Sequence, residues 1–169
     1  MSDTNPDHLE PTTRARFEQG RFEYERARPD MQIIVGCTWR DPVAQLAAWR
    51  AGKSNARLGQ SYHNPVGVDG KPRSYAIDFL LRVRATGDVL EGTSPAEWDQ
   101  YAEAAAYFKA VGFVWSGDWH RREGVPVECG HINARIPLAH AHAGRTPEWP
   151  DLPPDVPPAE PLEPRPRYV

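Results

Sequence analysis

The sequence predicts an α+β fold in which helices pack against a small, mostly antiparallel sheet. The first observation is the order of the elements, because helical patterns alternate with short apolar runs and few crossover connections join them. The second is the length of 169 residues, which suits one domain with a tail rather than two full cores. The third is that two cysteines are too few for a disulfide scaffold, so the fold depends on its apolar core.

Three segments carry helix signals, and we expect helices at about 13–27, 41–52 and 94–111. Pro29 ends the first segment, because the residue before a proline avoids helical backbone. Asp41 is suited to cap the second segment, and Ser94 with Glu97 forms the capping box of the third. The second helix is expected to present one face formed by Val43, Leu46, Ala47 and Arg50.

Apolar and β-branched runs predict strands at 31–37 and 75–83, and the stretches 113–119 and 125–136 indicate at least one further strand. The glycines and prolines of 59–74 indicate a long irregular loop before the second strand. The polar residues considered below fall on these strands and on this loop.

The two ends of the chain differ in composition from the middle. We expect a flexible N-terminus at 1–12, one folded domain at 13–146 and a Pro-rich tail at 147–169. Nine of the 18 prolines fall in that tail, a composition that favours extended chain over a packed element.

Charge and hydropathy exclude several classes of protein. The net charge of −3 provides no general attraction for nucleic acid. The chain has no apolar run of about 18 residues, and residues 1–9 are polar, so we expect neither a membrane span nor a signal peptide. The sequence therefore predicts a protein made soluble in the cytoplasm. Without coiled-coil heptads it is expected to be a monomer.

Four residues suggest chemistry: His63 in the long loop, Asp78 inside an apolar strand, and Glu128 with His131 near the last strand. Burying the Asp78 carboxylate among apolar neighbours costs about 2 to 7 kcal/mol or more unless a cation or several donors compensate it. A metal ion would compensate this charge. Two imidazoles and one carboxylate form a sufficient protein ligand set for a catalytic zinc with an open position for water.

Glu128 precedes His131 by three residues, so in a regular strand the two side chains would point to opposite faces. Gly130 between them is suited to a bend or bulge that lets both reach one site. With His131 on the metal, Glu128 would act as the general base and then deliver a proton to the leaving amine.

Other histidines and cysteines are weaker candidates for the metal. His140 and His142 would share a face in a strand, but no buried acid lies near them in the sequence. Cys129 is expected to point away from the site if Glu128 points into it. His120 is expected at the surface, and Cys37 is expected to pack as a small apolar side chain.

Several motifs taken in order resemble one family. They are Thr38-Trp39-Arg40, Gly52-Lys53-Ser54, Gly59-Gln60-Ser61-Tyr62-His63-Asn64, Ala76-Ile77-Asp78-Phe79, Gly112-Phe113-Val114-Trp115-Ser116-Gly117-Asp118-Trp119 and Glu128-Cys129-Gly130-His131. From about Met31 to Asn133 the chain resembles the VanY and D-alanyl-D-alanine carboxypeptidase group of zinc peptidases, the peptidase family M15. The resemblance is strongest to its branch of phage endolysins that are L-alanyl-D-glutamate endopeptidases, and it implies a Hedgehog/DD-peptidase-like fold.

The resemblance implies a role for each matching residue. It assigns His63, Asp78 and His131 as ligands of Zn²⁺ and Glu128 as the catalytic base. Arg40 matches an arginine that faces the substrate and could stabilise an oxyanion. Two further residues are implied in substrate binding: Ser61 and Trp115.

The chain departs from the family between its first two proposed ligands. Fifteen positions separate His63 from Asp78, as though residues around 65–74 had been inserted. A surface loop lengthens at low entropic cost, so the ligand set is retained while substrate access is open to change. The family's His-Phe-Glu ending is His131-Ile132-Asn133 here.

The expected function is that of a zinc-dependent peptidoglycan peptidase that cuts a stem-peptide bond, foremost L-alanyl-D-glutamate. An endolysin of this kind accumulates in the host cytoplasm and reaches the bacterial cell wall after membrane breach. One alternative is a D-alanyl-D-alanine carboxypeptidase with the same zinc chemistry. Another is a non-catalytic wall-binding or virion module that keeps the fold.

Overall fold

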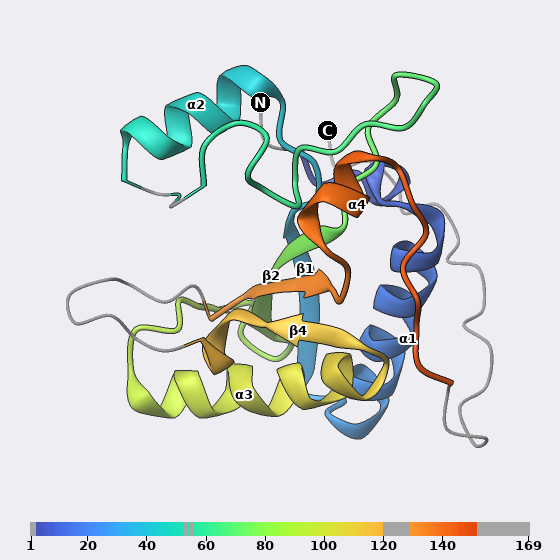
Figure 1. Ribbon diagram of the computed structural model, residues 1–169. Helices are drawn as coiled ribbons and strands as arrows, with labels where there is room; N and C mark the ends of the chain where they lie inside the picture. Colours follow the sequence, from blue (N-terminus) through green and yellow to red (C-terminus); the bar gives the residue numbers. More distant parts are fainter. Residues whose placement is uncertain (1–2, 53, 55, 120–128, 152–169) are drawn as a thin grey trace.

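The computed structural model describes residues 3–52, 54, 56–119 and 129–151 (Figure 1). Its elements in chain order are η1 (Pro6–His8), α1 (Pro11–Ala27), β1 (Met31–Cys37), α2 (Pro42–Arg50), β2 (Ala76–Val83), β3 (Val89–Leu90), α3 (Pro95–Ala110), β4 (Phe113–Trp115), η2 (Ser116–Asp118), β5 (His131–Ala134) and α4 (Leu138–His142). The predicted helices and the first two predicted strands are therefore present close to their expected bounds.

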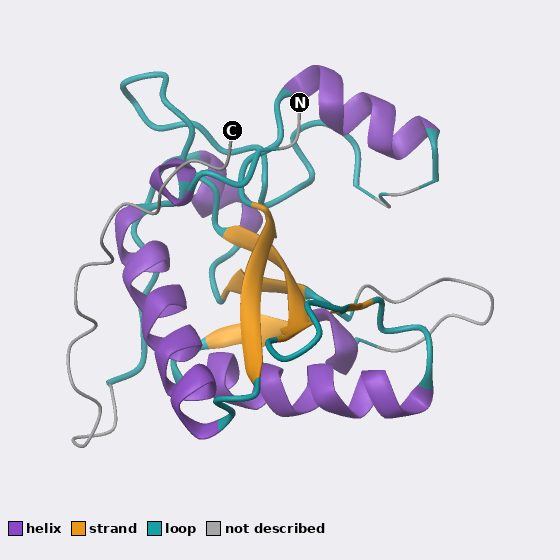
Figure 2. Cartoon of the chain, turned by 180° about the vertical axis from the view of Figure 1, so that it is seen from behind, coloured by secondary structure: helices purple, strands orange, loops and turns teal. Residues whose placement is uncertain are grey.

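The sheet has the order β1-β2-β5-β4, and β3 pairs with β2. All of these pairs are antiparallel, so the predicted α+β class with a small antiparallel sheet is confirmed. Figure 2 shows the sheet from behind, with the long helices α1 and α3 beside it. In the middle of the sheet β2 pairs with β5, although the two strands are far apart in sequence.

Aromatic side chains form the core between the helices and the sheet. Phe108 of α3 stacks on Phe17 of α1 at a centroid distance of 5.4 Å and lies 5.1 Å from Phe79 of β2. All three side chains are buried. Their burial removes a large apolar area from water and fixes β2 beneath the two helices.

Local sequence signals account for the helix starts. The Asp41 carboxylate accepts a hydrogen bond from the backbone N–H of Ala44 at the start of α2. Ser94 and Glu97 form the predicted capping box at the start of α3. These caps satisfy backbone donors that have no partner within the helix.

The residues before α1 make contacts that no periodicity in the sequence indicates. Asp3 pairs with the end of β1, where the N–H of Thr38 donates to the Asp3 carbonyl at 2.7 Å. Leu9 is buried in the core, and the Glu10 carboxylate accepts from the N–H of Thr13 to cap α1. At the other end, the Trp149 ring lies 5.1 Å from Phe113 in the core, so the start of the predicted tail packs on the domain.

Helix α2 departs from its expected packing. Its predicted apolar face is largely open to solvent, since Val43 is 77% exposed and Leu46 is 40% exposed. The buried residue of this helix is instead Gln45. The amphipathic spacing predicted the helix correctly, but no other described helix or strand packs extensively on it.

Among the described helices, none combines the length and apolar character needed to cross a bilayer.

Gly130 allows β5 to approach β2 immediately before His131. The N–H of Phe79 donates to the Gly130 carbonyl at 2.8 Å. A Cβ atom at Gly130 would lie 2.1 Å from the Phe79 carbonyl oxygen, whereas one at Gly36 would lie 3.2 Å from the Asp78 carbonyl oxygen. Glycine is thus required at 130 by the close approach of two backbones.

We predict that Gly130→Ala lowers the free energy of unfolding by about 1–3 kcal/mol, because the methyl group must push β5 away from β2. The matched variant Gly36→Ala should cost less, since its methyl group has more room. Urea denaturation of both variants measures the difference. Equal stability of Gly130→Ala and the parent chain would show that the two backbones are not held at this separation.

Candidate metal centre

Three site residues form a row across neighbouring strands. Cys37 of β1 lies opposite Asp78 of β2, and Asp78 lies opposite His131 of β5. The register of β1 shifts between Val35 and Cys37, a bulge that brings Cys37 rather than Gly36 opposite Asp78. Directly opposite residues in antiparallel strands project to the same face, so the row presents a thiol, a carboxylate and an imidazole together.

His63 reaches this row from the long loop. The loop is held in place because the N–H of Arg40 donates to the His63 carbonyl at 3.0 Å. The Ser61 hydroxyl accepts a hydrogen bond from the N–H of His63 at 3.2 Å, which forms a local turn at the histidine. The His63 side chain is 3% exposed and is therefore fixed by the surrounding structure.

The three predicted ligand atoms converge. His63 Nε2 lies 3.2 Å from Asp78 Oδ1, His131 Nδ1 lies 2.8 Å from the same oxygen, and the two nitrogens are 3.4 Å apart. Donor atoms about 2.0–2.1 Å from a tetrahedral zinc ion lie about 3.3 Å from one another. The separations of 3.2 and 3.4 Å match this spacing, and the third, 2.8 Å, is a hydrogen-bond distance, so the three atoms are close enough to share one small metal ion.

The orientation of His63 also suits a metal ligand. Its Nδ1 lies 2.6 Å from the backbone carbonyl oxygen of Thr38. With Nδ1–H donating to that carbonyl, the lone pair of Nε2 is directed at Asp78 and His131. Metal-bound histidines commonly donate their second ring N–H to a backbone carbonyl in this way, which fixes the tautomer.

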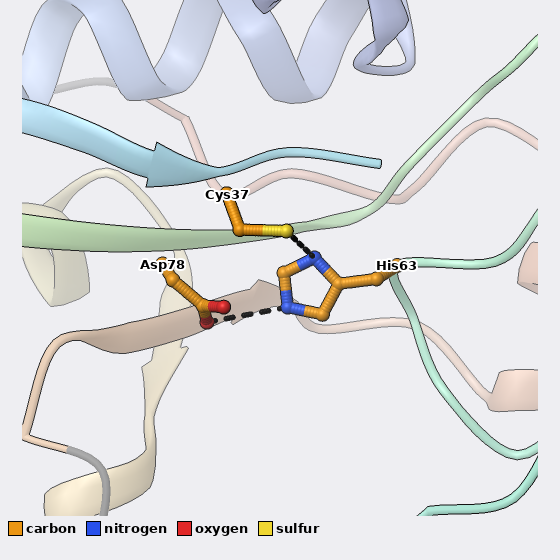
Figure 3. Close-up of side chains that lie close together, drawn as sticks. All are labelled: Cys37, His63 and Asp78. Atoms are coloured by element: carbon orange, nitrogen blue, oxygen red, sulfur yellow. Dashed lines mark hydrogen bonds and ion pairs between the residues drawn. The ribbon is translucent and has the colours of Figure 1, made fainter. Parts of the chain in front are cut away.

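Cys37 is a member of the site that the sequence did not reveal. Cys37, His63 and Asp78 each offer a ligand atom within 4.8 Å of the others, so this group could hold a metal ion. Figure 3 shows the His63 ring between the thiol and the carboxylate, and Cys37 Sγ lies 3.9 Å from Nδ1. Because His63 Nδ1 is already hydrogen-bonded to the Thr38 carbonyl, we favour the ligand set of His63, Asp78 and His131, in which His63 uses Nε2. The bulge that turns Cys37 inward has no signal in the sequence apart from Gly36.

The charges of the metal-free cluster are strongly coupled. Burial alone would lower the pKa of the His63 imidazole, but the adjacent Asp78 carboxylate outweighs it and raises that pKa to about 10. Burial would likewise raise the pKa of the Asp78 carboxyl, but His63 and His131 hold it well below its usual range. Without metal, the site therefore holds an imidazolium and carboxylate pair at neutral pH.

The Arg40 guanidinium contacts Oδ2, the second oxygen of the Asp78 carboxylate. Its Nη2 is 3.4 Å from Asp78 Oδ2, while Nη1 donates to Gln45 Oε1 at 3.3 Å. The Arg40 and Asp78 side chains are 12% and 26% exposed, so both members of this ion pair are largely withdrawn from solvent. Asp78 thus uses one oxygen toward the imidazoles and the other toward the arginine.

The remaining predicted residues differ in their relation to the site. Trp115 is buried in the core, where its indole N–H donates to the Cys129 carbonyl at 2.7 Å. Ser61 is buried in the turn at His63. Contact of Ser61 and Trp115 with a substrate stays a prediction. Glu128 lies outside the described residues, as does His120.

Trp119 is a site neighbour that the sequence analysis did not single out. Its ring lies 5.7 Å from the His131 ring, and the residue is 51% exposed. The aromatic motif that contains it was the available signal, but that motif fits core packing equally well. Trp119 gives the exposed edge of the site an apolar surface.

The rival histidines His140 and His142 belong to the short helix α4, in which residues two apart point in different directions. They therefore do not share the common face that a strand would give them. Cys129 is buried, with its Sγ 4.0 Å from the Glu91 carbonyl oxygen.

A solved structure gives an independent comparison for this fold. The chain resembles the L-Ala D-Glu endopeptidase ChiX of Serratia marcescens. The two are 21% identical in sequence with a TM-score of 0.52, and the match covers 79% of this chain and 85% of that chain. No protein-family model matches the chain. The likeness to ChiX shows that the fold is similar to that of a peptidase.

We predict a pH dependence for the metal-free protein. Because the pKa of His63 is raised from 6.5 to about 10, its stabilising contribution is complete below pH 6.5 and is lost as the pH rises through about 10. The pKa of Asp78 is lowered from 3.8, so its contribution is complete above pH 3.8 and is lost in acid. The melting temperature of chelator-treated protein should therefore fall between pH 7 and 10.

The variant His63→Gln should remove much of that alkaline decrease, whereas the matched variant His140→Gln should retain it. Differential scanning calorimetry at a series of pH values measures both. An identical pH profile in His63→Gln and in the parent chain would contradict the coupling of His63 to Asp78.

Proposed function

We propose that this chain is a zinc-dependent peptidase that hydrolyses the L-alanyl-D-glutamate bond in the stem peptide of bacterial peptidoglycan. The observation that carries the proposal is the convergence of His63 Nε2, Asp78 Oδ1 and His131 Nδ1 within 3.4 Å of one another. The order of motifs along the sequence and the peptidase-like fold support it. Its partner is then the bacterial cell wall, reached after the membrane is breached.

In this proposal His63, Asp78 and His131 hold the zinc ion. The bound ion would act as a Lewis acid that lowers the pKa of a bound water and polarises the substrate carbonyl group. The hydrogen bond from His63 to the Thr38 carbonyl keeps the imidazole in the tautomer that binds through Nε2. The protein thus provides a site whose donors are oriented before the metal arrives.

Glu128 takes the role of general base in the same proposal. Its carboxylate would accept the proton of the attacking water and then donate it to the amine that leaves. The close approach at Gly130 fixes the backbone directly before His131 and two residues after Glu128.

Arg40 is suited to stabilise negative charge on the substrate carbonyl. Within the part of the chain that the structure describes, its Nε is buried and has no hydrogen-bond partner. Its guanidinium is otherwise held by Asp78 and Gln45, which reduces the entropy lost when it binds an oxyanion. Arg40→Lys keeps the charge but removes the planar fork, so it should reduce kcat with little change in metal content.

The test is digestion of purified peptidoglycan with the zinc-loaded chain, followed by mass spectrometry of the soluble products. We expect new amino termini at D-glutamate. Release of free D-alanine from a stem pentapeptide would instead identify a carboxypeptidase. Absence of any cleavage by a fully zinc-loaded protein would contradict the enzymatic proposal and leave a wall-binding module of the same fold.

We predict that two measurements, zinc content and activity, distinguish the metal ligands from the general base. His63→Ala and Asp78→Asn should lower both the zinc content and the activity, because each removes a ligand. Glu128→Gln should retain zinc and lose about 100-fold or more in activity, the usual contribution of a general base. Zinc content is measured by elemental analysis of dialysed protein.

His140→Ala serves as the matched control, since it removes an imidazole of α4 that lies outside the convergent set. It should keep both zinc and activity. Retention of full zinc content in Asp78→Asn would rule out Asp78 as a ligand, and full activity in Glu128→Gln would rule out the assigned base.

A further inference from the structure

The segment 41–60 leaves the candidate metal centre and returns to it. It begins after Arg40 and ends shortly before His63, and the N–H of Arg40 donates to the His63 carbonyl at 3.0 Å. Figure 1 shows that its helix, α2, projects away from the sheet. We call its described residues, 41–52, 54 and 56–60, the α2 lobe. A polymer bound on the lobe can extend to the metal centre, because both ends of the lobe adjoin residues of that centre.

Gln45 fixes the lobe relative to the site. It is fully buried, and its Oε1 accepts from Arg40 Nη1 at 3.3 Å and from Asn64 Nδ2 at 3.5 Å. Its Nε2 donates to the Ser54 hydroxyl at 3.0 Å and to the Ala56 carbonyl. One amide side chain therefore joins α2, the returning loop and the arginine of the site. These hydrogen bonds connect the lobe to the site, so the lobe is not an independent unit.

The outer surface of the lobe is apolar and basic. Val43, Leu46 and Trp49 are 77%, 40% and 37% exposed. The Arg57 guanidinium lies over the Trp49 ring at 4.7 Å from its centroid, so the cation is stacked on one face of the indole.

The charge of the lobe is opposite to that of the whole chain. Between Asp41 and Gln60 the sequence has three basic residues and one acidic residue, whereas the full chain has a net charge of −3. The acidic residue, Asp41, is engaged in capping α2. Among the described residues of the lobe, Arg50 and Arg57 outnumber Asp41, so the lobe carries a net positive charge on a chain whose total charge is negative.

We propose that the α2 lobe binds the peptide-substituted glycan strand of the wall and holds it beside the metal centre. This inference rests on the proposed function, since it names the polymer that carries the scissile peptide. The apolar faces of sugar rings fit against the part of Trp49 that Arg57 leaves exposed, and stem-peptide carboxylates fit the guanidinium of Arg57. The lobe supplies affinity for the polymer, while the metal centre acts on the bond.

The test separates binding of the polymer from hydrolysis. Metal-free, chelator-treated full chain is sedimented with purified sacculi, and the bound fraction is measured over a range of protein concentrations. Trp49→Ala and Arg57→Ala should each bind about tenfold more weakly than the parent chain, as expected for truncation of a central contact. The matched control is Phe22→Ala, which removes an aromatic side chain 48% exposed on α1.

Phe22→Ala should bind as the parent does, and added salt should weaken parent binding more than that of Arg57→Ala. Zinc-loaded Trp49→Ala should hydrolyse a short soluble stem peptide at the parent rate while its KM on intact sacculi rises. Failure of the parent to cleave any stem peptide would refute the proposed function, whereas the sedimentation result bears on the lobe alone.

Unchanged sacculus binding by both Trp49→Ala and Arg57→Ala would overturn the lobe proposal. So would light scattering that shows a dimer of the parent chain and a monomer of Trp49→Ala, since a second copy would then cover this face. Melting temperatures of the variants serve as the control that each is folded at the assay temperature. Leu46→Ser provides a second substitution on the same surface.

Discussion

The structure depends on how the carboxylate of Asp78 is accommodated within an otherwise apolar strand. Its neighbours Ile77 and Phe79 are buried in the core, so the strand cannot move outward to hydrate the acid without losing that packing. Leaving such a charge without partners costs several kcal/mol, and removing one partner of a buried pair typically costs about 3–5 kcal/mol. Asp78 is instead contacted on one oxygen by two imidazoles and on the other by a guanidinium. The long loop, the segment between β1 and α2 and the strand β5 all contribute to this accommodation, so distant parts of the chain meet at one residue.

Part of this arrangement could be read from the sequence. An acid inside an apolar run is energetically costly, and this cost identified Asp78 and directed attention to the histidines that could compensate it. The capping residues Asp41 and Ser94 act through short-range hydrogen bonds, so local sequence was enough to place the starts of α2 and α3. The class of fold followed from the order of the elements, and the structure confirms it.

Other features depend on distant contacts and have no local signature. Cys37 faces the site because a bulge shifts the register of β1, and a bulge is set by the partner strand as much as by the bulged one. Amphipathic spacing in α2 shows that the helix has an apolar side, but it does not show whether the protein covers that side. The contacts of Asp3 and Leu9 likewise come from segments without periodicity, where sequence patterns carry little information.

The pairing of Asp78 with His131 makes assembly of the candidate metal centre dependent on strand register. The two residues are direct partners between β2 and β5, and side chains alternate between faces along each strand. A slip of one position would turn the imidazole to the opposite side of the sheet while most backbone hydrogen bonds could still form. Misregistered molecules would therefore look nearly native by secondary structure yet be unable to gather the donor atoms. The exposed part of the long loop, around 66–72, takes no part in this pairing, so evolution or design can change it without disturbing the register that gathers the donor atoms.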